Sequence, residues 1–406
     1  MGILHDDVVV MSPPDKEGDP TVITVNCPDK LGLGCDLSHI LLSFGLCISR
    51  VDFATDGKWC YIVMWVIGKA TTRWGLVKKR LVGACPTCSS ASGISYYREE
   101  LQHPPKPPNV FLLKFCCHDR MGLLHDVTEV LCELELYIQR VKVSTTPDGK
   151  VLDIFFITDT RELMHTKRRQ EDTKEHLRVV LGDEVVCDIE EVDIEVTGFS
   201  QASTFLRSAI TDEAFNFENP DKDGICNSVS MDNSLSPSHT LIQIVCRDYN
   251  GLLYDLMRTL KDYNIQIAYG RGTTKQNGNC EIDLFVVQAD GKKIVDSSKQ
   301  SALCSRLSNE LIQPLKVAVV SRGPDTELLV ANPVELSGRG RPLVIYHVTL
   351  ALKSLNICVF SAEIGRHNIE HRECEVYRFL LNEGDCISVP REKIEKTVWQ
   401  TLMGWE

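Results

Sequence analysis

The chain has 406 residues, of which 43% are hydrophobic and 25% are charged. This composition is typical of a globular protein of about two to four domains, and it excludes a disordered chain, a collagen and a coiled-coil rod. The 56 acidic and 44 basic side chains give a formal net charge of −12. Such a surface repels phosphate backbones, so we expect no direct binding of nucleic acid.

No segment predicts a membrane or secretory protein. The longest apolar run, 59–67, is much shorter than the roughly 20 residues of a membrane helix, and the N-terminus lacks the basic flank and apolar core of a signal peptide. The 17 cysteines are therefore expected to stay reduced inside the cell, in the cytoplasm, the nucleus or both. Cys85-Pro86-Thr87-Cys88 lacks the second pair of ligands that a zinc site needs, so we predict no metal and no cofactor.

The predicted elements follow one order that repeats along the chain. Each unit starts with an apolar run rich in β-branched residues, passes through a loop containing Asp and Gly into a helix, and continues with two strands, a second helix and a last strand. The expected first strands are 21–25, 110–115 and 241–245. The hairpins between the second and third strands are marked by Asp56-Gly57, Asp148-Gly149 and Asn277-Gly278, which accept positive φ. The order β-α-β-β-α-β predicts an α+β protein of tandem ferredoxin-like units.

The repeat is strongest around the first loop. Cys27–Leu33, Cys117–Leu123 and Cys246–Leu252 all read Cys-x-Asp-x-x-Gly-Leu, and the register continues without a gap through the following helices. A fourth copy is weaker, since His347 keeps the register of Asp255 but the preceding segment has no Asp-x-x-Gly-Leu. The chain therefore contains four similar units, of which the fourth is divergent.

The repeats and the composition divide the chain into seven segments. These are an N-terminal segment 1–20, unit one 21–102, a proline-rich linker 103–109, unit two 110–196, a flexible linker 197–238, unit three 239–322 and unit four 323–406. The last strand of unit three is predicted at Leu315–Val320. Unit four lacks a last strand, so we expect another unit or a second chain to cover its open sheet edge. From the linker lengths we expect unit one to pair with unit two, and unit three with unit four.

The shared loop has the polarity of an α-amino acid. Its glycine permits positive φ and a close approach, the following helix N-terminus attracts a carboxylate, and the aspartate can receive an ammonium group. A simpler interpretation is that Asp29, Asp119 and Asp248 only cap their helices. The residues alone favour capping, and both interpretations stay open.

Over its full length the sequence resembles the plant ACT-domain-repeat (ACR) family. Besides the Asp-x-x-Gly-Leu loops, the resemblance rests on Asp56–Tyr61, Thr146–Lys150, Gly251–Leu256 and Val334–Gly338. ACT domains are small regulatory modules that pair side by side and often bind amino acids where the first loop meets a neighbouring unit. By this resemblance the ligand-binding residues would be Asp29, Gly32 and Leu33, Asp119, Gly122 and Leu123, and Asp248, Gly251 and Leu252.

No catalytic signature accompanies the units. The chain has no P-loop, no Gly-x-Gly-x-x-Gly and no Gly-x-Ser-x-Gly motif. His367–His371 matches the pattern His-x-x-Glu-His, but it falls at an expected hairpin turn rather than on a helix. The units also resemble the sensory ends of bacterial uridylyltransferases, with no room left for a nucleotidyltransferase domain.

We therefore predict a regulatory protein without enzymatic activity. It would sense a free amino acid through unit–unit or homo-oligomeric pairing and act on an unidentified downstream protein. The alternative is a scaffold for protein–protein interaction that binds no ligand and keeps the Asp/Gly loops only for folding.

Overall fold

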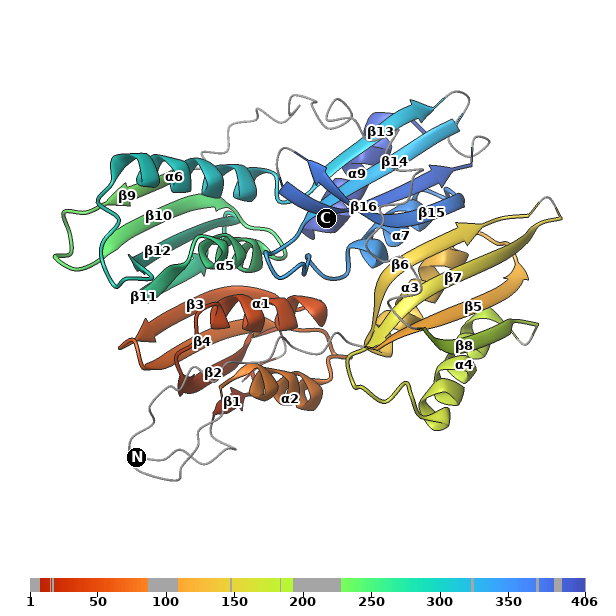
Figure 1. The fold of residues 1–406 in the computed structure, drawn as a ribbon, viewed down its shortest axis with the longest axis horizontal. Coiled ribbons are helices and arrows are strands. Elements are labelled where there is room, and N and C mark those ends of the chain that lie inside the picture. Colours follow the sequence, from red (N-terminus) through yellow and green to blue (C-terminus); the bar gives the residue numbers. More distant parts are fainter. Residues whose placement is uncertain are drawn as a thin grey trace. The chain divides into compact units, whose positions relative to one another are not determined.

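This computed structural model describes residues 8–14, 16, 18–86, 109–146, 148–182, 184–192, 228–322, 325–369, 372–382 and 389–405. The chain divides into two compact parts, one of Met1–Leu101 with Asn219–Pro314 and one of Gln102–Glu218 with Leu315–Glu406. Each part contains one eight-stranded sheet (Figure 1). We name them the 1–3 pair and the 2–4 pair, because each joins two units that are not neighbours in the sequence.

In the 1–3 pair, units one and three form a continuous sheet. Unit one supplies β1 (Val9–Ser12), β2 (Thr21–Pro28), α1 (Leu33–Ser43), β3 (Cys47–Thr55), β4 (Trp59–Ile67) and α2 (Trp74–Ala84). Unit three supplies β9 (Ser228–Asp232), β10 (Thr240–Arg247), α5 (Leu252–Asp262), β11 (Ile265–Thr274), β12 (Asn279–Gln288) and α6 (Ser297–Ile312). The strand order is β1-β2-β4-β3-β11-β12-β10-β9. The units meet where β3 pairs antiparallel with β11 and where α1 packs against α5.

The 2–4 pair is built in the same way. Unit two supplies β5 (Val110–His118), α3 (Leu123–Glu133), β6 (Leu136–Ser144), β7 (Lys150–Asp159), α4 (Lys167–Leu181) and β8 (Val186–Val192). Unit four supplies β13 (Lys316–Arg322), β14 (Asp325–Pro333), α7 (Val344–Ser354), β15 (Val359–Ile369), β16 (Arg372–Leu381) and α9 (Arg391–Met403). The strand order is β13-β14-β16-β15-β6-β7-β5-β8. Here β6 pairs with β15, and α3 packs against α7.

The α+β class with tandem ferredoxin-like units is confirmed, but the predicted pairing of the units is wrong. Hydrogen bonds join β3 to β11 and β6 to β15, so unit one pairs with unit three and unit two with unit four. Matching strand edges and helix faces decide this arrangement, and linker length does not. The proline-rich stretch 103–108 and the stretch 197–227 lie outside the described residues.

The outer strand of each unit is the second correction. Among the described residues, only unit two has the predicted order β-α-β-β-α-β, with β8 beside β5. In the other units the outer strand comes first, because β1 pairs with β2, β9 with β10 and β13 with β14. Leu315–Val320, predicted to end unit three, therefore belongs mostly to β13 and covers the edge of unit four. Strand β9 comes from the stretch 197–238 that was assigned to a linker.

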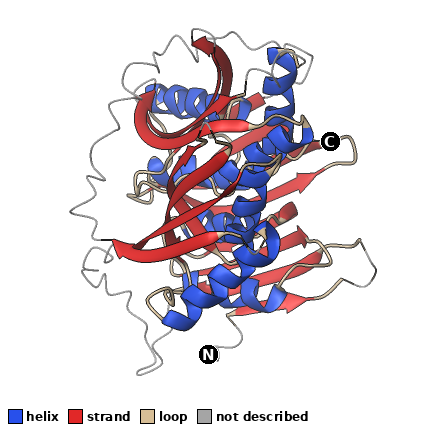
Figure 2. Ribbon diagram, turned by 90° about the vertical axis from the view of Figure 1, so that its right-hand side faces the viewer, coloured by secondary structure: helices blue, strands red, loops and turns tan. Residues whose placement is uncertain are grey.

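Alternating side chains place the core on one face of each sheet. Every second residue of β2 is buried, as are the inward-facing residues of β7, and the helices cover these faces (Figure 2). The hairpin glycines Gly57, Gly149 and Gly278 have φ of 83°, 74° and 78°, which confirms the predicted turns. None of the helices in the described residues combines the length and the apolar character that a membrane crossing requires.

Candidate functional site

The three Asp-x-x-Gly-Leu loops share one backbone conformation. Gly32, Gly122 and Gly251 directly precede α1, α3 and α5 with φ of 78°, 74° and 102°. These values lie in the left-handed region that favours glycine. The N-cap residue of each of these helices is the glycine, so none of the three loop aspartates occupies the N-cap position. The interpretation of the loop aspartates as helix caps is therefore wrong.

Each loop aspartate instead binds the hairpin that follows the second strand of its own unit. Its backbone N–H donates to a hairpin carbonyl oxygen, and its carboxylate accepts from a threonine hydroxyl at the end of that strand. The threonine Oγ1 to aspartate Oδ2 distances are 2.7 Å for Thr55–Asp29, 3.5 Å for Thr145–Asp119 and 2.6 Å for Thr274–Asp248. The carboxylate of Asp119 is thus the one bound most loosely within its own unit.

Unit four reproduces the turn without glycine and closes it with its own side chains. Leu343 precedes α7 with a φ of 62°. Arg366 of β15 donates to the carbonyl oxygen of Gly338 and, at 3.1 Å, to Oε1 of Glu375. Glu375 is only 5% exposed and also accepts from the Tyr377 hydroxyl at 3.1 Å. An ion pair between the partly exposed Arg366 and the buried Glu375 therefore lies next to the unit four loop, which has no Asp-x-x-Gly-Leu motif.

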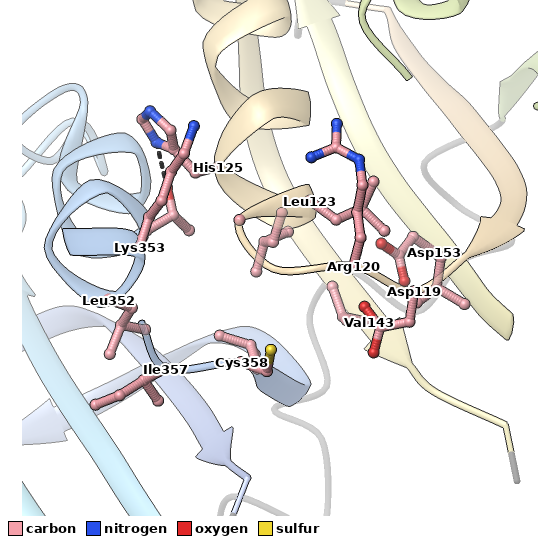
Figure 3. Close-up of a pocket in the computed structure, with 15 residues that line it drawn as sticks. Asp119, Arg120, Leu123, His125, Val143, Asp153, Leu352, Lys353, Ile357 and Cys358 are labelled. Atoms are coloured by element: carbon pink, nitrogen blue, oxygen red, sulfur yellow. Dashed lines mark hydrogen bonds between the residues drawn. The ribbon is translucent and has the colours of Figure 1, made fainter. Parts of the chain in front are cut away.

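A pocket opens where the loop of unit two meets α7 of unit four (Figure 3). Its empty volume is about 410 Å³, part of which is open to solvent. The predicted site residues Asp119, Gly122 and Leu123 line it from unit two, and Leu352 and Lys353 are among the residues that line it from unit four. The pocket thus occurs at a boundary between units, the place for a ligand that the resemblance to ACT domains implies.

Lys353 of α7 lies over the start of α3. Its Nζ is 2.7 Å from Oδ1 of Asp126, while Arg120 is 2.5 Å from Oδ2 of the same carboxylate. Burial alone would raise the pKa of Asp126, but the hydrogen bonds from Lys353 and Arg120 outweigh it and lower that pKa below its usual value. Both cations at the pocket are therefore engaged by Asp126.

His125 belongs to a buried polar cluster rather than to a free acid–base group. It is 4% exposed, and its Nδ1 lies 3.3 Å from Oγ1 of Thr349, which also lies 3.0 Å from the Thr128 hydroxyl. Burial and, after it, the charge of Lys353 lower the pKa of His125. A neutral imidazole at the contact between α3 and α7 is consistent with a structural role.

Two carboxyl groups in the pocket have no cationic partner among the described residues: Asp119 and Asp153. Burial raises the pKa of Asp119, opposed by hydrogen bonds from the backbone N–H of Arg120 and from Thr145. Asp153 is 1% exposed, and its Oδ1 has no hydrogen-bond partner in the described structure. Burial raises the pKa of Asp153 to about 7. A hydrogen bond with the backbone of Ser144 opposes this increase, and the charge of Asp119 adds to it.

Asp153 is not among the site residues predicted from the sequence. It lies on β7 between the buried residues Val151 and Phe155, in the alternating pattern of an inward-facing strand position. A carboxyl group in an otherwise apolar inward series was the signal that could have found it, because an unpaired buried acid is unfavourable.

Gly32 of unit one and the loop of unit three also lie where units meet. Lys261 of α5 is 3.6 Å from Oδ1 of Asp36, and a Cβ at Gly32 would lie 2.7 Å from Cδ of Lys261. This reproduces the contact of Lys353 with α3. On the other side, the Cys47 thiol donates to Oδ1 of Asn250, in the loop between Asp248 and Gly251, at 3.6 Å. Leu33 and Leu252 are buried, with 2% and 4% of their surface exposed.

Two further motifs carry no site in the described part of the chain. His367 lies on β15, whereas Glu370 and His371 lie outside the described residues, as does Cys88 of the Cys-x-x-Cys spacing. Among the residues that are described, no group of three His, Cys, Asp or Glu side chains is arranged to hold a metal ion.

Family models match four consecutive parts of the chain. They are described as "ACT domain-containing protein ACR10, N-terminal" for 11–86, "Plant bHLH transcription factor, ACT-like domain" for 108–180, "ACR9-like, ACT-like domain" for 228–325, and "ACT domain-containing protein ACR9, C-terminal" for 326–404. The four matches correspond to the four units.

Two relatives match over the whole length. ACT domain-containing protein ACR10 of Arabidopsis thaliana is 58% identical over 410 residues, and ACT domain-containing protein ACR9 of the same plant is 52% identical over 416 residues; each alignment covers 100% of both chains. A bifunctional uridylyltransferase/uridylyl-removing enzyme of Azospirillum brasilense is 37% identical over 87 residues, which is 21% of this chain and 9% of that enzyme. The similarity to such enzymes is therefore confined to a small part of them.

Proposed function

Since the chain belongs to the plant ACR family of ACT-domain proteins, we propose that it is a non-enzymatic amino-acid sensor whose ligand binds in the pocket between units two and four. The observation that carries this proposal is the composition of that pocket. It combines the carboxylate of Asp119, which has no cationic partner among the described residues, the N-terminus of α3 after Gly122, and side chains from a neighbouring unit.

An α-amino acid fits this arrangement by its two charges. Its carboxylate would lie at the N-terminus of α3, where the helix dipole and Lys353 favour an anion. Its ammonium group would be received by Asp119. Val143, Ile357 and Val359 offer apolar surface for the side chain of the ligand.

Ligand binding at this place couples to assembly, because both units contribute to the pocket. A ligand that binds only the paired state stabilises it by RT ln(1 + [L]/Kd), which is about 2.7 kcal/mol at a hundredfold excess over Kd. The change in pairing of α3 with α7 is the signal that a downstream protein would recognise.

The loops differ in how suitable they are for a ligand. Asp29 and Asp248 are held by their own threonines at 2.7 and 2.6 Å, whereas the Thr145–Asp119 distance is 3.5 Å. In unit four, Arg366 and Glu375 close the corresponding region. We therefore propose that the main ligand site lies in unit two. Secondary sites would lie in units one and three, at Gly32, Leu33, Gly251 and Leu252.

The test is a thermal-shift screen of the full chain against the twenty standard L-amino acids. Hits are repeated on Asp119→Asn, which keeps the shape of the side chain and removes its charge, with Asp29→Asn and Asp248→Asn as matched controls. We expect a selective shift of a few degrees that is lost only in Asp119→Asn. A shift that survives in Asp119→Asn would move the site elsewhere, and a flat screen confirmed by calorimetry would favour a ligand-independent scaffold.

A further inference from the structure

We propose that Asp153 is a second ligand-binding carboxyl group of this pocket, which receives the ammonium group of the ligand together with Asp119 and releases a proton when the ligand binds. This inference rests on the proposed function and extends it, because it makes binding by unit two dependent on pH. Units one and three would not share this dependence.

The position of Asp153 supports a role in binding. Its side chain lies beside that of Asp119 on the unit two side of the pocket, with Val143 next to them (Figure 3). It is 1% exposed, and among the described residues Oδ1 has no hydrogen-bond partner. A buried polar atom without a partner is unfavourable for folding, so a cationic group of a ligand at this place would satisfy an acceptor that the protein leaves unsatisfied.

The carboxyl group is specific to unit two. The strand pairing identifies the equivalent positions in the other complete loops, since Asp153 lies opposite Phe115, Ile62 opposite Val25, and Ile282 opposite Ile244. Where unit two has an acid, units one and three therefore have isoleucine. The acid thus occurs in the same unit as Asp119, the loop aspartate with the longest distance to its threonine, Thr145.

The charged groups around Asp153 leave its negative charge without a counter-ion. Several titratable groups face Asp153, line the same pocket or lie directly next to such groups. They are Cys117 on β5, Asp119 and Arg120 in the loop, His125 and Asp126 on α3, Lys353 on α7, and Cys358 after α7. Arg120 and Lys353 both bind Asp126, at 2.5 and 2.7 Å. The ammonium group of a ligand is the cation that the Asp119 and Asp153 carboxyls lack.

Of these groups, Asp153 is the one expected to change its charge near neutral pH. Burial, opposed by the Ser144 backbone and reinforced by the Asp119 charge, raises the pKa of Asp153 to about 7. Burial raises the pKa of Cys117 to about 11, so this thiol stays protonated. Burial and Lys353 lower the pKa of His125, so the imidazole stays neutral.

The proton balance follows from these states. At pH 7 about half of the free protein carries a protonated Asp153, and in the complex the carboxylate faces the ammonium group. The ligand keeps its proton, and the proton of Asp153 passes to the solvent. Binding therefore releases about half a proton at pH 7, and the affinity increases about tenfold from pH 6 to pH 8 if the pKa of Asp153 falls well below 6 in the complex.

The experiment measures binding to the full chain as a function of pH. Thermal-shift titrations with each of the twenty standard L-amino acids are made at pH 6, 7 and 8, and each amino acid that binds is titrated by calorimetry at pH 7 in two buffers of different ionisation enthalpy. The variants are Asp153→Asn, which cannot ionise but matches the shape of the protonated acid, and Asp153→Ile, which has the residue of units one and three.

We expect about tenfold tighter binding at pH 8 than at pH 6 for the wild type, and weaker binding without this pH dependence for both variants. If Asp153→Asn keeps the pH dependence, or if the wild type shows no proton release while Asp119→Asn abolishes binding, the role of Asp153 is refuted and the proposed function stands. If no amino acid binds the wild type at any of the three pH values, the proposed function fails and this inference fails with it.

Discussion

Replacement of Gly122 by alanine tests the contact between units two and four. The φ of 74° at this position lies in the left-handed region, where an alanine costs about 1–2 kcal/mol. A Cβ would also lie 3.0 Å from both Cδ and Cε of Lys353. The lysine would have to move, which weakens its 2.7 Å ion pair with Asp126. Because Lys353 is 42% exposed, this second part adds only about 0.5–1 kcal/mol.

Gly149 provides the matched control, since it has the same φ of 74° but no atom within 4 Å of the place that an added Cβ would occupy. Gly149→Ala should therefore show the backbone cost alone, and Gly122→Ala should exceed it. The assay is urea denaturation of the full chain together with amide hydrogen exchange of α3 and α7. In a Lys353→Ala background the excess should disappear. Equal losses for the two glycine variants, or an excess that survives in that background, would refute the packing of Lys353 on the loop.

Three further substitutions test other parts of the molecule. Arg258 is fully buried and lies 2.8 Å from Glu310, so Arg258→Met should destabilise the 1–3 pair by about 3–5 kcal/mol in urea denaturation. Arg306 is a partly exposed partner of the same carboxylate, so Arg306→Ala should cost below about 1 kcal/mol. Equal costs for the two variants would contradict the buried ion pair. Asp126 has a lowered pKa, so its contribution to the free energy of unfolding is present above the unfolded-state pKa of about 4 and is lost as the pH falls through its folded-state pKa. Asp126→Asn should therefore be less stable than the wild type at pH 7. A loss of stability that persists at pH 2 would argue against an ionic cause. Asp153 has a raised pKa, so the wild type should lose stability as the pH rises from about 4 to 7, by up to about 1.4 kcal/mol per pH unit. In thermal denaturation without ligand at pH 8, Asp153→Asn should therefore be more stable than the wild type. If the carboxylate were ionised and paired, the wild type would be the more stable protein.

Local patterns in the sequence predict the parts of the fold that depend on a few neighbouring residues. The hairpin glycines Gly57, Gly149 and Gly278 have the positive φ that their dipeptides require. Gly122 and its equivalents mark the helix starts for the same reason. The residues of the pocket on the unit two side, Asp119 and Gly122, could be identified because a repeated motif is visible in one sequence.

The position of the outer strands could not be predicted in the same way. In an antiparallel sheet an outer strand makes the same hydrogen bonds whether it comes before the first central strand or after the second helix. Strand β9 reads Ser-Val-Ser-Met-Asp, with no buried residue along it, so its composition resembles that of a linker. Leu315–Val320 has a clear strand pattern, but nothing in the pattern shows that its partner is β14 rather than β10.

The pairing of units and the role of the loop aspartates depend on residues far apart in the sequence. Which sheet edges join is decided by the fit of β3 to β11 and of β6 to β15, and neither edge carries a local signature. Likewise, an aspartate four residues before the first residue of a helix suggests a cap, whereas the structure gives Asp119 a partner, Thr145, directly after β6. The alternating pattern of β7 marks Asp153 as an inward-facing acid, but only the structure shows that it lies beside Asp119 in the pocket.

The arrangement of charges suggests how ligand binding could change the contact between α3 and α7. In the structure Lys353 and Arg120 both bind Asp126, the carboxylate in the first turn of α3, and the two cations outnumber this one acid. The carboxylate of a bound amino acid would compete with Asp126 for Lys353. Since Lys353 lies directly on Gly122, a shift of this lysine would alter the contact between α7 and the start of α3. In unit four the Arg366–Glu375 pair already lies next to the corresponding loop. A single ligand would therefore act on one side of the 2–4 pair, which makes the response of this pair asymmetric even though its two units share one fold.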